Sequence, residues 1–225
     1  MAQQSKNQNI ETSQNVGEAV SKAEKFFKEY GKKVSICTIA VVAVALVIVA
    51  VMQFYVKPLQ AEAANQTYAA EQYFRSGIYD LALNGDGNAL GFAQVVDEYG
   101  KKAGAAVYLY AGICELQLGN ADNAISYLKK YNGKDEILAA RAICCMGDAY
   151  AMKEDYSSAM AQYEKAANYA DNAYAAGYLL KAGMMAEELD NNAKALSLYE
   201  RIKKEYPQTL EGYEIEKYIN RIQVK

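Results

Sequence analysis

Chemistry in this chain would have to come from thiols, carboxylates and lysines, because the sequence contains no histidine. Its absence excludes Ser-His-Asp and Cys-His catalytic pairs, histidine-bound zinc or haem, and imidazole acid–base catalysis. The cysteines at positions 37, 114, 144 and 145 lack the C-x-x-C spacing of redox and zinc sites. We interpret them as small apolar residues, with a disulfide from Cys114 to Cys144 or Cys145 as the alternative.

Carboxylates offer one further pattern, a possible calcium loop. Asn84, Asp86 and Asn88 alternate as the first ligands of such a loop do. The loop would also need glycine at its sixth position and glutamate at its twelfth, where Ala89 and Val95 stand. No other acids, bases or nucleophiles cluster in the sequence, so we expect a protein that is not an enzyme and that holds no metal or cofactor.

Composition favours a helical protein that does not bind nucleic acid. The net charge is −3, whereas phosphate binding requires a basic face. Only two prolines occur in 225 residues, which favours long helices with few interruptions. We therefore expect other proteins as partners, and no small-molecule substrate.

Residues 34–56 form a run of 23 residues without a charged side chain, bounded by Lys33 and Lys57. At ~1.5 Å per residue, a helix of this length covers the ~30 Å hydrocarbon core of a bilayer. The run predicts a single transmembrane helix. A cleaved signal peptide is the alternative, because Ala61-Glu62-Ala63 resembles a cleavage site, although signal sequences have shorter apolar regions.

The distribution of lysines around this run predicts its orientation. Five lysines precede it closely, at positions 22, 25, 28, 32 and 33, while only Lys57 and Arg75 occur in the twenty residues after it. The positive-inside rule then places the N-terminus in the cytoplasm and the remainder of the chain outside.

Residues 1–33 form the predicted cytoplasmic tail. Residues 1–15 are polar and typical of disorder. The tail then carries apolar residues at helical spacing, which predicts a short amphipathic helix on the membrane surface or, alternatively, an extension of the transmembrane helix. These apolar residues are Val16, Val20, Ala23, Phe27 and Tyr30.

The part of the chain after the predicted transmembrane helix contains an internal sequence repeat. A glycine is followed twelve residues later by an alanine and, after four more, by a large apolar residue, with successive copies 35 and 36 residues apart. The glycines are Gly112, Gly147 and Gly183; the alanines are Ala124, Ala159 and Ala195; the large residues are Leu128, Tyr163 and Tyr199. Because glycine weakens a helix, its recurrence indicates a point where a partner helix presses on the backbone.

This pattern resembles the tetratricopeptide repeat, a helix-turn-helix unit of about 34 residues. The resemblance implies an all-α fold, in which the transmembrane helix precedes an α-solenoid of about four helix pairs and a C-terminal capping helix. We assign a divergent first repeat to residues 57–104, with its second helix broken near Gly85 and resuming through Phe92. Three repeats follow in residues 105–209, and the capping helix occupies residues 210–225, with Thr209 as its N-cap.

The resemblance also implies a concave groove lined by the first helix of each repeat. Such a groove could hold an extended or helical peptide, unless another helix of the same chain fills it. The family's groove positions correspond here to Leu109, Ile113, Leu116, Gln117, Arg141, Cys144, Asp148, Met152, Leu180, Met184, Glu187 and Glu188.

The layout as a whole is similar to that of membrane-anchored bacterial tetratricopeptide proteins, which include the ancillary subunit of the Sec translocon. This likeness implies a noncatalytic module in the bacterial inner membrane that binds partner or client polypeptides on the periplasmic side, next to the translocon and chaperones. Two alternatives remain open: a structural scaffold for cell division or outer-membrane assembly, or a cytosolic domain like that of anchored mitochondrial import receptors.

Overall fold

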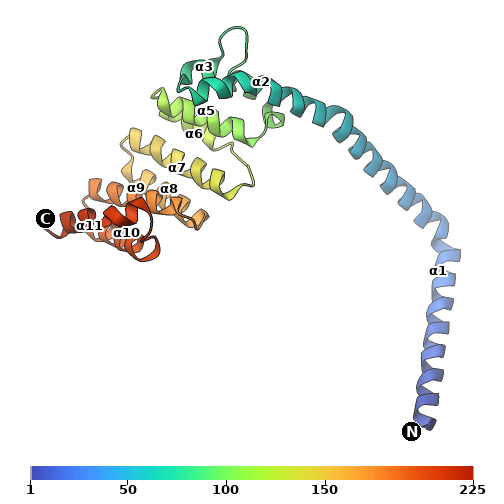
Figure 1. The fold of residues 1–225 in the computed structure, drawn as a ribbon. Coiled ribbons are helices and arrows are strands. Elements are labelled where there is room, and N and C mark those ends of the chain that lie inside the picture. The colour runs from blue at the N-terminus through green and yellow to red at the C-terminus, as the bar shows by residue number, and fades with distance from the viewer. Residues whose placement is uncertain (1, 225) are drawn as a thin grey trace. The chain divides into compact units, whose positions relative to one another are not determined.

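The computed structural model describes the backbone of residues 2–224 and the side chains of Ser21, Glu24, Lys25 and residues 28–224. Every regular element in this described part is a helix, and no strand occurs in it (Figure 1). The predicted all-helical fold is therefore confirmed. The chain divides into two units, Met1–Lys57 and Pro58–Lys225.

The first unit is one long helix. Helix α1 (Ala2–Val51) continues into a π-helical turn, Met52–Val56. The backbone of residues 2–15 is helical rather than disordered, since this stretch contains no proline or glycine to stop a helix. Of the predicted amphipathic face, the side chains of Val16, Val20, Ala23 and Phe27 lie outside the described residues.

By length and composition, one helical stretch within Lys28–Arg75 could cross a membrane. None of the residues in its most apolar window is buried by other parts of the protein. Leaving so many large aliphatic side chains in water would be costly, and an apolar surface on every face is typical of a membrane span.

From Lys57 onward, the chain forms a series of shorter helices joined by turns and loops. They are α2 (Lys57–Arg75), α3 (Tyr79–Asn84), α4 (Phe92–Tyr99), a 3₁₀ turn (Gly100–Ala103), α5 (Ala105–Gln117), α6 (Ala121–Leu128), α7 (Glu136–Met152), α8 (Tyr156–Tyr169), α9 (Tyr174–Glu188), α10 (Asn192–Glu205) and α11 (Leu210–Gln223). Three helix pairs, α5–α6, α7–α8 and α9–α10, stack in sequence order (Figure 1). They form the expected solenoid.

The second helix of the first repeat is interrupted, as its sequence predicted. Helix α3 ends at Asn84, where Gly85 adopts a φ of 79°, and α4 resumes at Phe92. Between them, the carboxylate of Asp86 accepts hydrogen bonds from the backbone N–H groups of Asn88 and Ala89 and from the Tyr73 hydroxyl, at 2.7–2.8 Å. These bonds, the one from Tyr73 foremost, lower the pKa of Asp86 to about 2. The carboxylate thus organises its own loop.

The turn inside each complete repeat has the same backbone conformation. Gly119, Glu154 and Asp190 occupy equivalent positions and all have a positive φ, at 85°, 59° and 54°. The next residue is the N-cap of the second helix; Asp155 and Asn191 accept the backbone N–H three residues further on. The left-handed conformation reverses the chain, and only Gly119 adopts it without steric strain.

The recurring glycines lie where the two helices of each pair cross. A Cβ atom at Gly112 would come within 2.6 Å of Leu128, one at Gly147 within 2.6 Å of Tyr163, and one at Gly183 within 2.2 Å of Tyr199. The alanines of the repeat, at positions 124, 159 and 195, are completely buried at the same crossings. Small residues therefore let a large side chain of the second helix lie directly on the backbone of the first.

The cysteines serve as small apolar residues of this core. All four are free thiols, and Cys114, Cys144 and Cys145 are buried. Burial raises the pKa of Cys114 and Cys144 to about 12 and that of Cys145 to about 11. The disulfide alternative is not found, and the protonated thiols are poor nucleophiles at neutral pH.

Helix α11 closes the C-terminal end. The Thr209 hydroxyl accepts the backbone N–H of Gly212 at 3.0 Å, as predicted for its N-cap. Ile215, Ile219 and Ile222 are buried in the same cluster as Leu198 and Ile202 of α10. The helix thereby covers apolar surface that the last repeat would otherwise expose to water.

Replacing Gly183 with alanine tests the crossing geometry. The added methyl group must displace the ring of Tyr199, and we expect the free energy of unfolding to fall by about 1–3 kcal/mol, as is usual for an overpacked core. Denaturant unfolding followed by circular dichroism measures this change. Gly31→Ala is the control, because nothing lies within 4 Å of a Cβ there, and it should leave the unfolding of the repeat domain unchanged. Equal stability of both variants would contradict the close approach.

Candidate functional site

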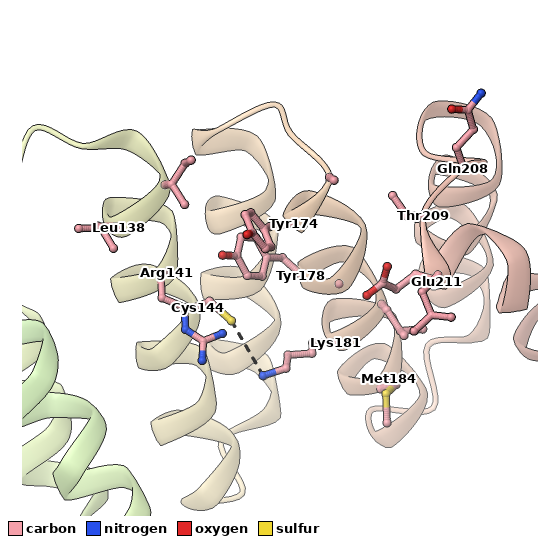
Figure 2. A pocket seen from close by; sticks show the side chains of 15 residues that line it. Leu138, Arg141, Cys144, Tyr174, Tyr178, Lys181, Met184, Gln208, Thr209 and Glu211 are labelled. Atoms are coloured by element: carbon pink, nitrogen blue, oxygen red, sulfur yellow. Dashed lines mark hydrogen bonds between the residues drawn. The ribbon is translucent and has the colours of Figure 1, made fainter. Parts of the chain in front are cut away.

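A groove with a volume of about 890 Å³ opens between α7, α9 and the beginning of α11 (Figure 2). Its walls come from first helices and from the chain that enters the capping helix. The lining residues are Ile137, Leu138, Arg141, Cys144, Ala173, Tyr174, Gly177, Tyr178, Leu180, Lys181, Met184, Gln208, Thr209, Leu210 and Glu211.

Four of the groove residues expected from the sequence line this groove: Arg141, Cys144, Leu180 and Met184. They come from the second and third complete repeats. Cys144 is buried at its base, while Met184 is 42% exposed. The second and third repeats therefore contribute to the site from two adjacent first helices.

The positions expected on α5 do not line it. Leu109 is only 2% exposed and belongs to a core cluster with Ala142, Cys145 and Ala149 of α7. Ile113 and Leu116 pack against the same cluster, and Gln117 lies exposed at the end of α5. The small side chains of α7 let it approach α5 closely, so this part of the expected groove is filled by core packing.

The remaining expected positions also lie elsewhere. Met152 borders a separate, shallower cleft beside Lys153, which forms an ion pair with Asp122. Glu188 is exposed at the end of α9. The carboxylates of Asp148 and Glu187 are each engaged by neighbouring helices.

Sequence reasoning missed the aromatic and C-terminal parts of the groove. Tyr174 and Tyr178 project into it from α9, and Glu211 reaches it from α11 (Figure 2). Leu210 of α11 also lines it. The two tyrosines precede Lys181 by seven and three residues, so helical spacing places all three side chains on one face of α9. The contribution of α11 depends on how the capping helix docks, which repeat spacing does not specify.

Large apolar side chains in the groove remain accessible to solvent. Tyr174 is 62% exposed and Leu210 is 72% exposed, beside the half-exposed Met184. These residues are available for contact with a ligand, and tyrosine and methionine are both enriched in protein interfaces. The exposed surface is therefore suited to a polypeptide with apolar side chains.

Lys181 is fixed at the floor of the groove by Asp148. Its ammonium group lies 2.5 Å from the Asp148 carboxylate, which also accepts a hydrogen bond of 2.8 Å from the Tyr163 hydroxyl. Burial alone would lower the pKa of Lys181, but the interaction with Asp148 helps to raise it above its ordinary value. The lysine is consequently charged and already paired.

The next repeat contains the same three-part interaction. The Tyr199 hydroxyl donates to Glu187 over 2.7 Å, and Arg221 of α11 pairs with the same carboxylate at 2.5 Å. In both cases, a tyrosine of the second helix and a cation of the following first or capping helix share one carboxylate. Burial and the nearby carboxylate raise the pKa of Tyr163 and of Tyr199, so both hydroxyls remain protonated donors.

Comparison with known families fits this arrangement of helix pairs. Residues 106–134 and 178–209 match the family model described as tetratricopeptide repeat. The chain contains tetratricopeptide repeats. The unmatched stretch between these repeats holds α7 and α8, which have the same helix-turn-helix arrangement.

A solved structure has a fold similar to that of this chain. The crystal structure of MamA protein has a TM-score of 0.54 and 18% sequence identity to this chain, and the match covers 72% of this chain and 86% of that one. At this identity the likeness concerns the fold. No curated protein matches the sequence.

Replacing Tyr199 with phenylalanine tests the shared-carboxylate interaction within the tetratricopeptide domain. The ring remains on Gly183, but the buried hydrogen bond to Glu187 is lost, and we expect unfolding to become easier by about 1–2 kcal/mol. Tyr213→Phe is a matched control on α11, because Tyr213 is 75% exposed, and its effect should stay within about 0.5 kcal/mol. Denaturant unfolding compares the two, and indistinguishable stabilities would contradict a role for the Tyr199 hydroxyl.

Proposed function

We propose that this protein is a noncatalytic protein-protein interaction module, tethered to a membrane, that holds a segment of a partner or client polypeptide in the groove between α7, α9 and α11. The observation that carries the proposal is the accessible apolar lining of this groove, formed by Tyr174, Met184 and Leu210. The tetratricopeptide fold supports it, because this fold is a scaffold for binding proteins and peptides.

The character of the lining favours a polypeptide over a rigid small molecule. Tyrosine supplies a large contact area at a low cost in conformational entropy, and methionine adapts its shape to different side chains. A groove of about 890 Å³ can accept several consecutive residues. Clients with varied sequences can therefore share one site.

The apolar helix supports attachment to a membrane. Residues 34–56 carry no charge, and no residue of the most apolar window in this helix is buried by the rest of the protein, so a bilayer is the environment that would cover it. The excess of lysines before this run supports a cytoplasmic N-terminus, and hence a repeat domain in the periplasm of a bacterium. The resemblance in layout favours a place beside the Sec translocon and its chaperones.

Because the domain is tethered to the membrane, weak binding in the groove is sufficient for function. A domain held at the membrane meets polypeptides emerging there at a raised effective concentration, so modest affinity still gives substantial occupancy. Weak binding also permits release of the bound polypeptide to another protein.

Photocrosslinking in cells tests whether the groove binds polypeptides. A photoreactive amino acid at Met184 or Tyr174 should yield adducts with other polypeptides, since both side chains face the groove and are exposed. The same amino acid at Ser197, which is exposed on α10 and does not line the groove, is the control and should yield far fewer. Equal adduct yields at both places, or none at Met184, would argue against the proposal.

Protease treatment of spheroplasts tests the orientation. If the repeat domain is periplasmic, added protease should digest residues after Lys57 while an N-terminal epitope tag remains protected until the membrane is permeabilised. A cytoplasmic protein and a known periplasmic domain serve as controls in the same sample. Protection of the repeat domain in intact spheroplasts, with loss of the tag before the membrane is permeabilised, would place the domain in the cytosol instead.

A further inference from the structure

Two charged side chains of the groove have no ion-pair partner among the described residues. Arg141 of α7 is exposed, and Glu211 of the first turn of α11 is half-buried. Neither forms a salt bridge with another described residue, whereas the third charge, Lys181, is paired with Asp148. The groove therefore presents one available cation and one available anion.

These two charges belong to opposite walls of the groove. Arg141 projects from α7, Glu211 projects from α11, and the aromatic and aliphatic side chains of α9 lie between them (Figure 2). Tyr174 and Tyr178 make up this central apolar part, and Met184 lies nearer to Glu211. A ligand that crosses α9 would meet the Arg141 charge, then the tyrosines beside the already paired Lys181, and then the Glu211 charge.

Local packing directs Glu211 toward α9. Gly177 faces it, and a Cβ atom at position 177 would lie 3.2 Å from the Glu211 Oε1 atom. The missing side chain of Gly177 leaves the space that this carboxylate occupies at the groove wall. Both partners of this contact line the groove, which makes the carboxylate part of its surface.

We propose that the groove selects polypeptide segments in which an apolar run is flanked by an acidic side chain at one end and a basic side chain at the other, with the acidic end bound by Arg141 and the basic end by Glu211. The inference rests on the proposed function. The proposal is based on charge complementarity: a charged side chain in a partly apolar groove interacts favourably with a ligand group of the opposite charge. Segments with the wrong charge at either wall are disfavoured by like-charge repulsion, which gives the bound segment a defined direction.

Peptide binding to the full-length protein in lipid nanodiscs tests this directly. The probes are acetylated, amidated peptides in which a run of uncharged, mainly apolar residues, varied in length from about four to eight, lies between one Glu and one Lys. Matched probes replace the Glu, the Lys or both with Gln. Fluorescence polarisation gives each dissociation constant.

We expect each protein charge to recognise only its own end of the peptide. Arg141→Gln should weaken the Glu/Lys peptide about five- to tenfold and leave the peptide lacking Glu unaffected, because close charge pairs at interfaces show measurable coupling. Glu211→Gln should weaken the Glu/Lys peptide to a similar degree and leave the peptide lacking Lys unaffected. Circular dichroism and thermal unfolding establish that both variants remain folded.

Several outcomes would overturn the inference. Equal binding of charged and uncharged peptides by the unmodified protein would mean that the groove recognises apolar character alone, and the proposed function would stand. If no peptide bound while crosslinking at Met184 still captured polypeptides, the charge rule would fail and the proposed function would again stand. If the two substitutions changed self-association in sedimentation experiments instead of peptide affinity, the occupant would be a second copy of this chain.

Discussion

The architecture of the repeat domain depends on how closely the two helices of each pair approach at their crossing. Gly112, Gly147 and Gly183 allow Leu128, Tyr163 and Tyr199 to rest on the backbone of the preceding helix. Because a methyl group at any of these glycines would occupy the same space, the helices of each pair are held at close range. The first helices then stack beside one another, and their outward-facing side chains form a common surface that includes the groove.

At two of these crossings the large residue is a tyrosine, which contributes both to packing and to an electrostatic interaction. Leu128 only fills space, whereas Tyr163 and Tyr199 also carry a hydroxyl past the crossing to a carboxylate on the first helix. That carboxylate then attracts a cation from the next repeat or from α11. Lys181 is thereby held at the groove floor and Arg221 holds α11 in place, so both ion pairs help to position the walls of the groove.

Much of this fold was predictable because its determinants are local and periodic. The spacing of glycine, alanine and a large residue identified the helix pairs, the glycines near Asn84 identified the interruption, and Thr209 identified the start of α11. The groove was less predictable because it depends on how closely neighbouring repeats approach. Leu109 has a groove position by analogy but is covered by the small residues of α7, and Glu211 joins the groove only through the docking of α11.

The shared-carboxylate interactions depend on the order of the repeats. The anion always belongs to the earlier element and the cation to the later one, from Asp148 to Lys181 and from Glu187 to Arg221. An exchange of α7–α8 with α9–α10, or an inserted duplicate, would bring mismatched residues together at these positions. A chain ending before α11 would leave Glu187, whose side chain is only 11% exposed, without its cation. Each of these two carboxylates is therefore matched to the element that follows it in the chain.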